Sequence, residues 1–269
     1  MPSNVASPAD AREPAPAALL LTGERTLPGI ADERYWFERH VVAYDLAREH
    51  VGPGSVVLDA GCGEGYGLPM LADAGASRVI GVDLDGQVIA HVAATYASGD
   101  KRIEAVAAEL MDMPLADGEV DLAVSFQVIE HLHDIPGYLH SLRRVTRAGG
   151  HVLIATPNRL TFTPGSDTPV NPFHTREFTA DELRAELEAA GLDVVTVLGI
   201  FHGDVLRQAD EALGRSLMHV LGAGPPETWP DWVRQLVHRT TAAWFEVGTD
   251  DLDAALDLVA VATVPDEPR

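Results

Sequence analysis

Short runs of apolar residues recur along the middle of the chain, separated by longer stretches with helical periodicity. The apolar runs lie at 55–59, 78–83, 120–125 and 151–155, and three of them end at or just before a polar residue. Helical patterns fall between them at about 66–75, 86–98 and 135–147, and Gly149 and Gly150 are expected to end the last helix. Alternating strands and helices predict a parallel sheet that is covered on both faces and binds ligands at the carboxyl ends of its strands.

The later part of the chain adds further elements to this core. Thr179 and Glu182 have the spacing of a capping box at a helix start, and two more strands are expected at 194–199 and 257–264. The roughly 55 residues between those strands are mostly helical and too many for a simple connection. They therefore form either a cap over the site or an oligomer surface, such as that of a homodimer.

The expected fold class is α/β, with a Rossmann-like, seven-stranded, mostly parallel sheet and helices on both faces. An N-terminal helical lid and a helical insertion before the last strand complete it. The expected divisions are a disordered tail at 1–18, a lid segment at 19–51, the core at 52–200, a helical cap at 201–250, and the final strand with a C-terminal tail at 251–269. The first tail is rich in Pro, Ala, Ser and Asp, which cannot bury enough apolar surface to stay ordered.

The net charge of the chain limits the classes of molecule that it is expected to bind. The 269 residues include 41 acidic and 19 basic side chains, for a net charge of -22. A surface this negative repels phosphate backbones and anionic lipid heads, so neither nucleic acid nor membrane is an expected partner. No apolar run approaches the roughly 20 residues of a membrane span, no secretory signal is recognisable, and a lone Cys62 fits a reducing compartment. The expectation is a cytoplasmic enzyme.

A glycine-rich loop follows the first predicted strand, over 57–67. Gly61, Gly63 and Gly65 allow a left-handed backbone and a close ligand approach. Dinucleotide enzymes use similar loops, in which a helix start faces a diphosphate. Here Asp59 precedes the glycines and Glu64 lies among them. Two carboxylates suit a cationic ligand with an ammonium and a sulfonium better than they suit a diphosphate.

Acidic residues also mark the ends of the next strands. Asp83 lies about 20 residues past the loop, where a carboxylate can accept hydrogen bonds from both ribose hydroxyls. Glu109 and the backbone of Leu110 are placed to hold adenine, while Leu110 and Met113 cover its face. A glycine turn that served packing alone would not account for acidic residues at successive strand ends.

The order of these motifs resembles the class I S-adenosylmethionine-dependent methyltransferase superfamily over about residues 52–200. The motifs are, in chain order, DAGCGEGYG, GVDLD, AELMDMPLADGEVDLAVSFQVIEHL and LRRVTRAGGHVLIATPN. The resemblance implies S-adenosylmethionine as the cofactor. It implies these contacts: Asp59, Gly61, Cys62, Gly63 and Gly65 at the methionine end, Asp83 and Leu84 at the ribose, Glu109 and Leu110 at the adenine, and Gln127 near the sulfonium. Glu109 departs from the family, which more often has Asp there.

A hydroxyl acceptor needs a base or a metal ion near the sulfonium, whereas amine acceptors often do not. Glu130 and His131 follow the fourth strand, and His174 lies in the loop after the fifth. They resemble the metal-binding element of the ubiquinone-biosynthetic and small-RNA-methylating branches, which implies that these three residues bind Mg²⁺. Gln127 replaces a Glu of that element and weakens the site for a hard cation. The hypothesis is that Glu130, His131 and His174 are catalytic. The alternative is that Glu130 and His131 only cap the following helix and pack under the loop.

Four short motifs lie near the two ends of the core: TGERTLPG at 22–29, YWFERH at 35–40, TPNRLT at 156–161 and NPFHTREF at 171–178. They resemble those of an actinobacterial group encoded among polymethylated-polysaccharide genes, the methylmannose-polysaccharide 1-O-methyltransferases. That resemblance implies a mannoside hydroxyl as acceptor. Sugar recognition uses aromatic faces and planar polar groups, for which the candidates are Tyr35, Trp36, Asn158 and Arg159. The alternative is that the aromatic residues anchor the cap. Three other functions stay open: a natural-product O- or N-methyltransferase, an NAD-binding oxidoreductase, and a non-catalytic S-adenosylmethionine-binding protein.

Overall fold

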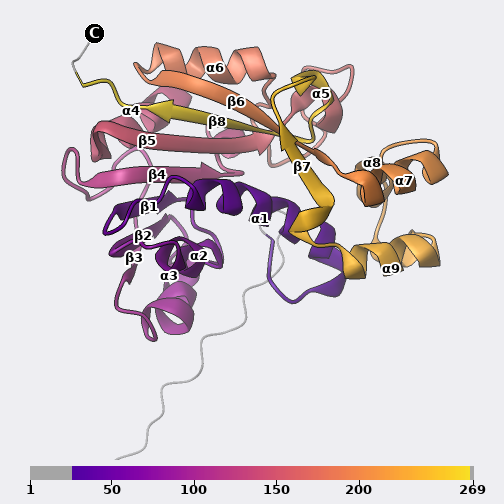
Figure 1. The fold of residues 1–269 in the computed structure, drawn as a ribbon, viewed down its shortest axis with the longest axis horizontal. Helices are drawn as coiled ribbons and strands as arrows, with labels where there is room; N and C mark the ends of the chain where they lie inside the picture. The colour runs from indigo at the N-terminus through magenta and orange to yellow at the C-terminus, as the bar shows by residue number, and fades with distance from the viewer. Residues whose placement is uncertain (1–25, 267–269) are drawn as a thin grey trace, which may run out of the picture.

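The structure, a computed structural model, describes residues 26–266, which build one eight-stranded sheet between two layers of helices (Figure 1). The strand order is β3-β2-β1-β4-β5-β8-β6-β7. Neighbouring strands from β3 to β5 are parallel, whereas β8 is antiparallel to both β5 and β6, and β7 is antiparallel to β6. The strands are β1 (Val56–Ala60), β2 (Arg78–Asp83), β3 (Ile103–Ala107), β4 (Val120–Phe126), β5 (Thr146–Pro157), β6 (Asp193–His202), β7 (Phe245–Gly248) and β8 (Asp257–Thr263).

Two helical layers cover the sheet and form two apolar cores. Helices α1 (Arg34–Arg48), α2 (Gly67–Asp73) and α3 (Gly86–Val92) pack on one face, and a π-helical turn extends α3. Helices α4 (Ile135–Val145) and α6 (Ala180–Ala189) pack on the other. Because both faces are covered, the central strands are almost continuously buried, which explains their unbroken apolar runs.

The sequence predicted most of these elements, and the structure corrects two details. The capping box of Thr179 and Glu182 is present at the start of α6. Gly149 and Gly150 do not end a helix: α4 stops at Val145 and both glycines lie inside β5. Gly150 is needed there because an added Cβ would lie 2.7 Å from the Thr146 side chain. The sheet has eight strands rather than seven, since the four-residue β7 is too short to give a recognisable pattern.

The predicted cap is largely helical, as expected. It holds α7 (Asp204–Leu213), α8 (Leu217–Gly222) and α9 (Asp231–Arg239), and a short helix α5 (Arg159–Phe162) follows β5. The cap helices stand beyond the end of the sheet toward which β5 and β6 run (Figure 1). None of the helices between residues 26 and 266 is long and apolar enough to cross a membrane.

The N-terminal helix, predicted to be part of a lid, packs on the sheet as one layer of the fold. Tyr35, Val42, Ala43, Tyr44 and Ala47 on α1 are all buried in the core that faces α2. The helix also contacts α9, so it ties the cap to the sheet. The tail predicted at 1–18 and the last residues of the C-terminal tail lie outside the described residues.

Candidate active site

A cavity of about 670 Å³ opens at the carboxyl ends of β1, β2 and β4, and we call it the cofactor cavity. This is the edge at which parallel α/β sheets bind their ligands. Seven of the ten predicted cofactor contacts line this cavity, namely Gly61, Gly63, Asp83, Leu84, Glu109, Leu110 and Gln127. His131 lines it as well. Residues from four separate loops therefore meet at this edge of the sheet.

The glycine loop is held against β2 by its backbone. The N–H groups of Gly61 and Cys62 donate to the carbonyl of Val82 at 2.8 and 3.0 Å. Gly61 has φ +83°, and an added Cβ would lie 2.5 Å from the Val128 side chain. Gly63 has φ +53° and nothing within 4 Å of an added Cβ. The first glycine is thus required by packing and the second leaves open space at the cavity wall.

Asp83 and Leu84 give the cavity a polar and an apolar wall. The Asp83 carboxylate accepts hydrogen bonds from the N–H groups of Gly63 and Asp85 at 3.1 and 2.9 Å. Leu84 leaves 69% of its surface exposed, and Met111 leaves 39%. None of the residues that line this cavity is Lys or Arg. A nucleoside with a cationic sulfonium suits such walls, whereas a diphosphate would meet carboxylates without a compensating cation.

Three predicted contacts do not line this cavity. Cys62 is buried and lines a small neighbouring cavity of about 60 Å³. Gly65 faces α3, because an added Cβ would lie 2.8 Å from the Val92 side chain. Asp59 is fully buried and accepts a hydrogen bond of 3.0 Å from the Tyr44 hydroxyl. Gly65 therefore serves helix packing, and contact of Asp59, Cys62 and Gly65 with the methionine end stays a prediction.

Glu64 also has a different role from the one its sequence position suggests. Its carboxylate contacts His91 Nε2 at 2.7 Å and accepts a hydrogen bond from the Tyr96 hydroxyl at 2.8 Å. Both partners lie in the segment of α3 and its π-helical extension. The side chain therefore fastens the glycine loop to the helix instead of standing free for a cationic ligand.

The burial of Asp59 predicts a specific pH dependence of stability. Burial raises the pKa of its carboxyl to about 7 from 3.8, although the Tyr44 hydrogen bond lowers it. The folded protein therefore holds a proton that the unfolded chain releases, so stability present below about pH 4 is lost as the pH rises toward 7. We expect the free energy of unfolding of wild type to fall by about 2–3 kcal/mol relative to Asp59→Asn between pH 5 and pH 8.

Urea unfolding of both proteins across this pH range measures the difference. Other buried carboxyl groups titrate in both proteins, so the comparison isolates Asp59. Parallel curves for the two proteins would contradict the assigned environment of this carboxyl.

Gln127 stands at the end of β4 in an unusual backbone conformation, with φ 56°. Its amide Nε2 donates to Asp257 Oδ1 at 3.4 Å. Asp257 in turn lies 2.8 Å from Arg39 Nε, and both members of this ion pair are buried. The amide is thus held at the cavity wall by residues from α1 and β8, a role for Arg39 and Asp257 that the sequence did not indicate.

Glu130, His131 and His174 come together as predicted. Each offers one ligand atom, and these atoms lie within 4.8 Å of one another; we call the group the Glu-His-His cluster. Glu130 is fully buried, accepts a hydrogen bond from the Thr156 hydroxyl at 3.0 Å, and has its Oε1 without a partner. Burial raises the pKa of Glu130 to about 8. Because His131 lines the cofactor cavity, the cluster borders that cavity.

The His174 ring is oriented by two neighbours in its own loop. Its Nδ1 lies 2.8 Å from Glu177 Oε1, and its Nε2 lies 2.9 Å from the Asn171 amide nitrogen. Glu177 accepts only from an Nδ1–H, so Nε2 carries the lone pair and accepts from Asn171. A histidine fixed in this way has its tautomer set for use as a base or as a metal ligand.

Two of the predicted acceptor contacts are instead interior residues. Tyr35 is fully buried, with its hydroxyl 2.7 Å from His202 Nε2. Asn158 is also fully buried; its amide donates to three backbone carbonyls at 2.8–3.1 Å, and its oxygen caps α5. With their polar atoms occupied, Tyr35 and Asn158 are unsuited to bind an acceptor, and that prediction is wrong for both.

The other two candidates lie nearer the surface. Trp36 is half-buried, with the Arg39 guanidinium 4.9 Å from its ring centre. Arg159 forms ion pairs with Asp167 at 2.6 Å and Glu182 at 3.1 Å. Contact of either residue with an acceptor stays a prediction.

Comparison with known proteins identifies the family. Residues 58–154 match the family model of a methyltransferase domain. A probable S-adenosylmethionine-dependent methyltransferase of Mycolicibacterium smegmatis is 46% identical, over 93% of this chain and 97% of its own. The chain belongs to the S-adenosylmethionine-dependent methyltransferase family. A probable methyltransferase of this type from Mycobacterium tuberculosis is 44% identical, over 96% of this chain and 94% of its own.

Solved structures show that the methyltransferase fold is shared. Geranyl diphosphate C-methyltransferase from Streptomyces coelicolor has a TM-score of 0.57 at 16% identity, over 83% of this chain and 80% of that chain. An S-adenosylmethionine-dependent methyltransferase from Mesorhizobium loti has a TM-score of 0.53 at 19% identity, over 82% and 97%. Membership of this family shows that the protein is an enzyme that uses S-adenosylmethionine. It excludes the alternative of an NAD-binding oxidoreductase.

Proposed function

We propose that this methyltransferase acts on a hydroxyl group, and that the acceptor is a sugar, as in the transfer to the 1-hydroxyl of a mannoside. The observation that carries the proposal is the Glu-His-His cluster at the border of the cofactor cavity. A hydroxyl is a weak nucleophile until its proton is removed, so an O-methyltransferase needs a proton acceptor beside the sulfonium. An amine acceptor would leave this cluster without a use.

The residues of the chain suggest a simple reaction. The acceptor oxygen forms a bond to the methyl carbon while the carbon–sulfur bond breaks, and S-adenosylhomocysteine leaves as a neutral thioether. The hydroxyl proton passes to His174 Nε2 once the acceptor replaces the Asn171 amide there. Glu177, hydrogen-bonded at Nδ1, stabilises the resulting imidazolium.

The cluster also fits a divalent metal ion. The partnerless, buried Oε1 of Glu130 and the two neighbouring imidazoles form a three-ligand set. When bound, a metal ion would occupy the Nε2 lone pair of His174 in place of the proton, and it would instead lower the pKa of the acceptor hydroxyl. Two imidazoles and one carboxylate suit Mn²⁺, Fe²⁺ or Zn²⁺ better than Mg²⁺, which prefers oxygen ligands. Gln127 adds no charge here, and its amide nitrogen is engaged with Asp257.

The proposal is tested by transfer of labelled methyl groups from S-adenosylmethionine to three acceptor classes: neutral mono- and oligosaccharides that include mannosides, phenols, and primary amines. Each reaction is run with EDTA and with added Mn²⁺ or Mg²⁺. We expect label on a sugar hydroxyl, located by NMR of the product. Transfer to amines alone, or to phenols in preference to every sugar, would contradict the proposed acceptor.

A further inference from the structure

The Gln127 side chain lies where two cavities meet. It lines the cofactor cavity and also the small neighbouring cavity of about 60 Å³. Gly61 and Gly63 line both as well, so Gln127 supplies the one side chain that the two linings share. The predicted nucleoside contacts line the first cavity, whereas Cys62, a predicted methionine contact, lines the second. The sulfonium joins the nucleoside to the methionine, so this junction is where it would lie.

The backbone of Gln127 is held in a conformation that non-glycine residues adopt rarely, with φ 56°. Its N–H donates to the carbonyl of Ala155 at 2.8 Å, which ties the end of β4 to the neighbouring strand β5. A positive φ of this kind persists where the surrounding structure imposes it, and such residues cluster at binding sites. The fold therefore sets the direction in which this side chain leaves the backbone.

Asp257 determines which end of the Gln127 amide faces the protein interior. The amide Nε2 donates to Asp257 Oδ1 at 3.4 Å, and Asp257 is fully buried. A carboxylate accepts hydrogen bonds and has none to donate, so it selects the amide nitrogen over the amide oxygen. Asp257 lines neither cavity. With the nitrogen directed at the wall, the amide oxygen is available to the cavity.

Arg39 keeps the Asp257 carboxyl charged. Its Nε lies 2.8 Å from Asp257 Oδ2, and both side chains are buried. Burial raises the pKa of Asp257, whereas the neighbouring guanidinium lowers it. Without the guanidinium, burial alone would favour the neutral acid, which can donate to an amide oxygen. The ion pair is therefore what restricts the amide to one orientation.

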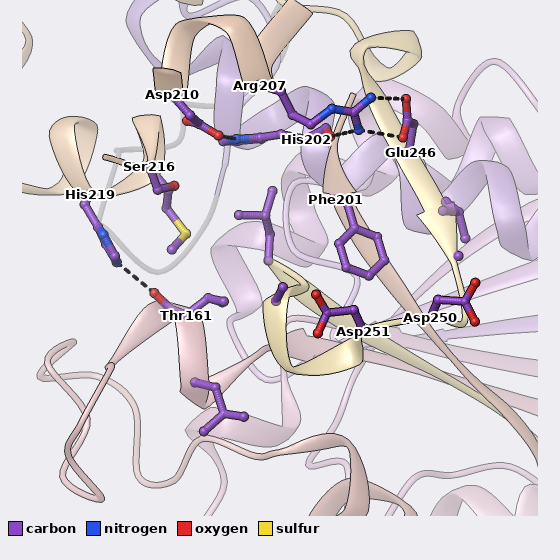
Figure 2. A pocket seen from close by; sticks show the side chains of 16 residues that line it. Thr161, Phe201, His202, Arg207, Asp210, Ser216, His219, Glu246, Asp250 and Asp251 are labelled. Carbon is purple, nitrogen blue, oxygen red and sulfur yellow. Dashed lines mark hydrogen bonds and ion pairs between the residues drawn. The ribbon is translucent and has the colours of Figure 1, made fainter. Parts of the chain in front are cut away.

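The cap holds Arg39 from the other side. Arg39 Nη1 donates to Met218 Sδ at 3.3 Å. The preceding residue, Leu217, donates its N–H to Asp210 Oδ1 at 2.6 Å, and Asp210 Oδ2 lies 2.6 Å from His202 Nδ1. Figure 2 shows this contact between Asp210 and His202, in the wall of a cavity of about 620 Å³ within the cap. Helices α7 and α8 thus fix the arginine that faces Asp257.

We propose that Arg39 and Asp257 are positioning residues, which orient the Gln127 amide so that its oxygen faces the sulfonium of S-adenosylmethionine. The partial negative charge of this oxygen attracts a sulfonium, whereas the neutral thioether of S-adenosylhomocysteine gains little from it. The three residues therefore favour the methyl donor over its product in the same cavity, which limits inhibition by the product. This inference concerns the cofactor and does not depend on the acceptor.

Calorimetry with the full chain and no acceptor tests the proposal, with S-adenosylmethionine and S-adenosylhomocysteine as the two probes. Gln127→Met keeps the length of the side chain and removes the amide. We expect the Kd for S-adenosylmethionine to rise about tenfold in this variant, and the Kd for S-adenosylhomocysteine to stay within about twofold of wild type.

The double variant Arg39→Met/Asp257→Asn tests the positioning role. It removes both charges, because losing one would leave the other buried and unpaired. The amide is then free to turn, so we expect the Kd for S-adenosylmethionine to rise at least about threefold while that for S-adenosylhomocysteine stays within about twofold. A merely structural role would weaken both probes alike.

Two variants serve as matched controls. Gln87→Met changes an exposed glutamine on α3 that lines neither cavity. Arg48→Met/Asp45→Asn removes an ion pair from α1 whose side chains are exposed. Both should keep the wild-type Kd for each probe. Equal weakening of both probes in Gln127→Met, or no weakening, would overturn the contact with the sulfonium. A wild-type ratio of the two Kd values in the Arg39/Asp257 variant would overturn the positioning role.

Nuclear magnetic resonance of the ¹⁵N-labelled wild-type protein with S-adenosylmethionine tests the amide orientation with the ion pair intact. The side-chain amide signal of Gln127 is assigned by its absence in Gln127→Met. Its protons should exchange with solvent at least about tenfold more slowly than those of Gln87, because one is donated to a buried carboxylate. Exchange as fast as that of Gln87 would overturn the proposal, even where the double variant is too unstable for calorimetry.

Discussion

Replacing His174 by alanine is expected to lower the rate of methyl transfer by about a hundredfold or more, the usual contribution of a positioned proton acceptor. The effect should fall on kcat, because His174 does not line the cofactor cavity and its loss leaves the cofactor contacts in place. Steady-state kinetics with saturating S-adenosylmethionine measures this, and calorimetry with S-adenosylhomocysteine checks that the binding site is intact.

His133→Ala is the control, since this histidine is exposed, lies two residues from His131 and is outside the Glu-His-His cluster. Its activity should match wild type. Glu177→Gln provides a second measurement: the ring of His174 stays, but the group that orients it changes. An unchanged kcat in His174→Ala, with normal cofactor affinity, would show that the cluster takes no part in proton transfer.

Replacing Asp83 by alanine is expected to raise the Kd for S-adenosylhomocysteine about a hundredfold. The carboxylate lies at the end of β2 in the cofactor cavity, where ribose hydroxyls would donate to it. Each hydrogen bond to a charged group contributes about 1.5–3 kcal/mol, and every 1.4 kcal/mol is tenfold in Kd. Removal of the carboxylate also frees the N–H groups of Gly63 and Asp85.

Asp112→Ala is the matched control for charge, because Asp112 is an exposed carboxylate near the same edge and does not line the cavity. Its Kd should stay within about twofold of wild type. The Kd of Asp83→Asn should lie between those of wild type and Asp83→Ala, because an amide keeps a hydrogen-bond acceptor but loses the charge. A wild-type Kd in Asp83→Ala would mean that the nucleoside binds elsewhere.

The features that the sequence predicted are those set by local pattern. Apolar runs identified the central strands because strands buried on both faces need them. The capping box at Thr179 and the meeting of Asp83 with the glycine loop follow from short motifs and from the common edge of parallel strands.

The features that could not be predicted from the sequence depend on contacts between segments that are distant along the chain. Arg39, Gln127 and Asp257 form one connected polar group, although they lie on α1, after β4 and on β8. Asn158 and Tyr35 have the side chains of sugar-binding residues, and only tertiary packing shows that their polar atoms are already paired. Gly63 and Gly65 are identical in the motif but face the cavity and α3, respectively.

The most direct test of the Glu-His-His cluster is Mn²⁺ binding to the protein saturated with S-adenosylhomocysteine, followed by electron paramagnetic resonance. We predict one Mn²⁺ per chain in wild type and in His133→Ala, and loss of that site in both Glu130→Gln and His174→Ala. Methyl transfer to a sugar hydroxyl should fall with EDTA and return with Mn²⁺. Absence of a stoichiometric site in wild type, together with full sugar methylation in EDTA and in His174→Ala, would contradict the assignment of this cluster as the deprotonating centre.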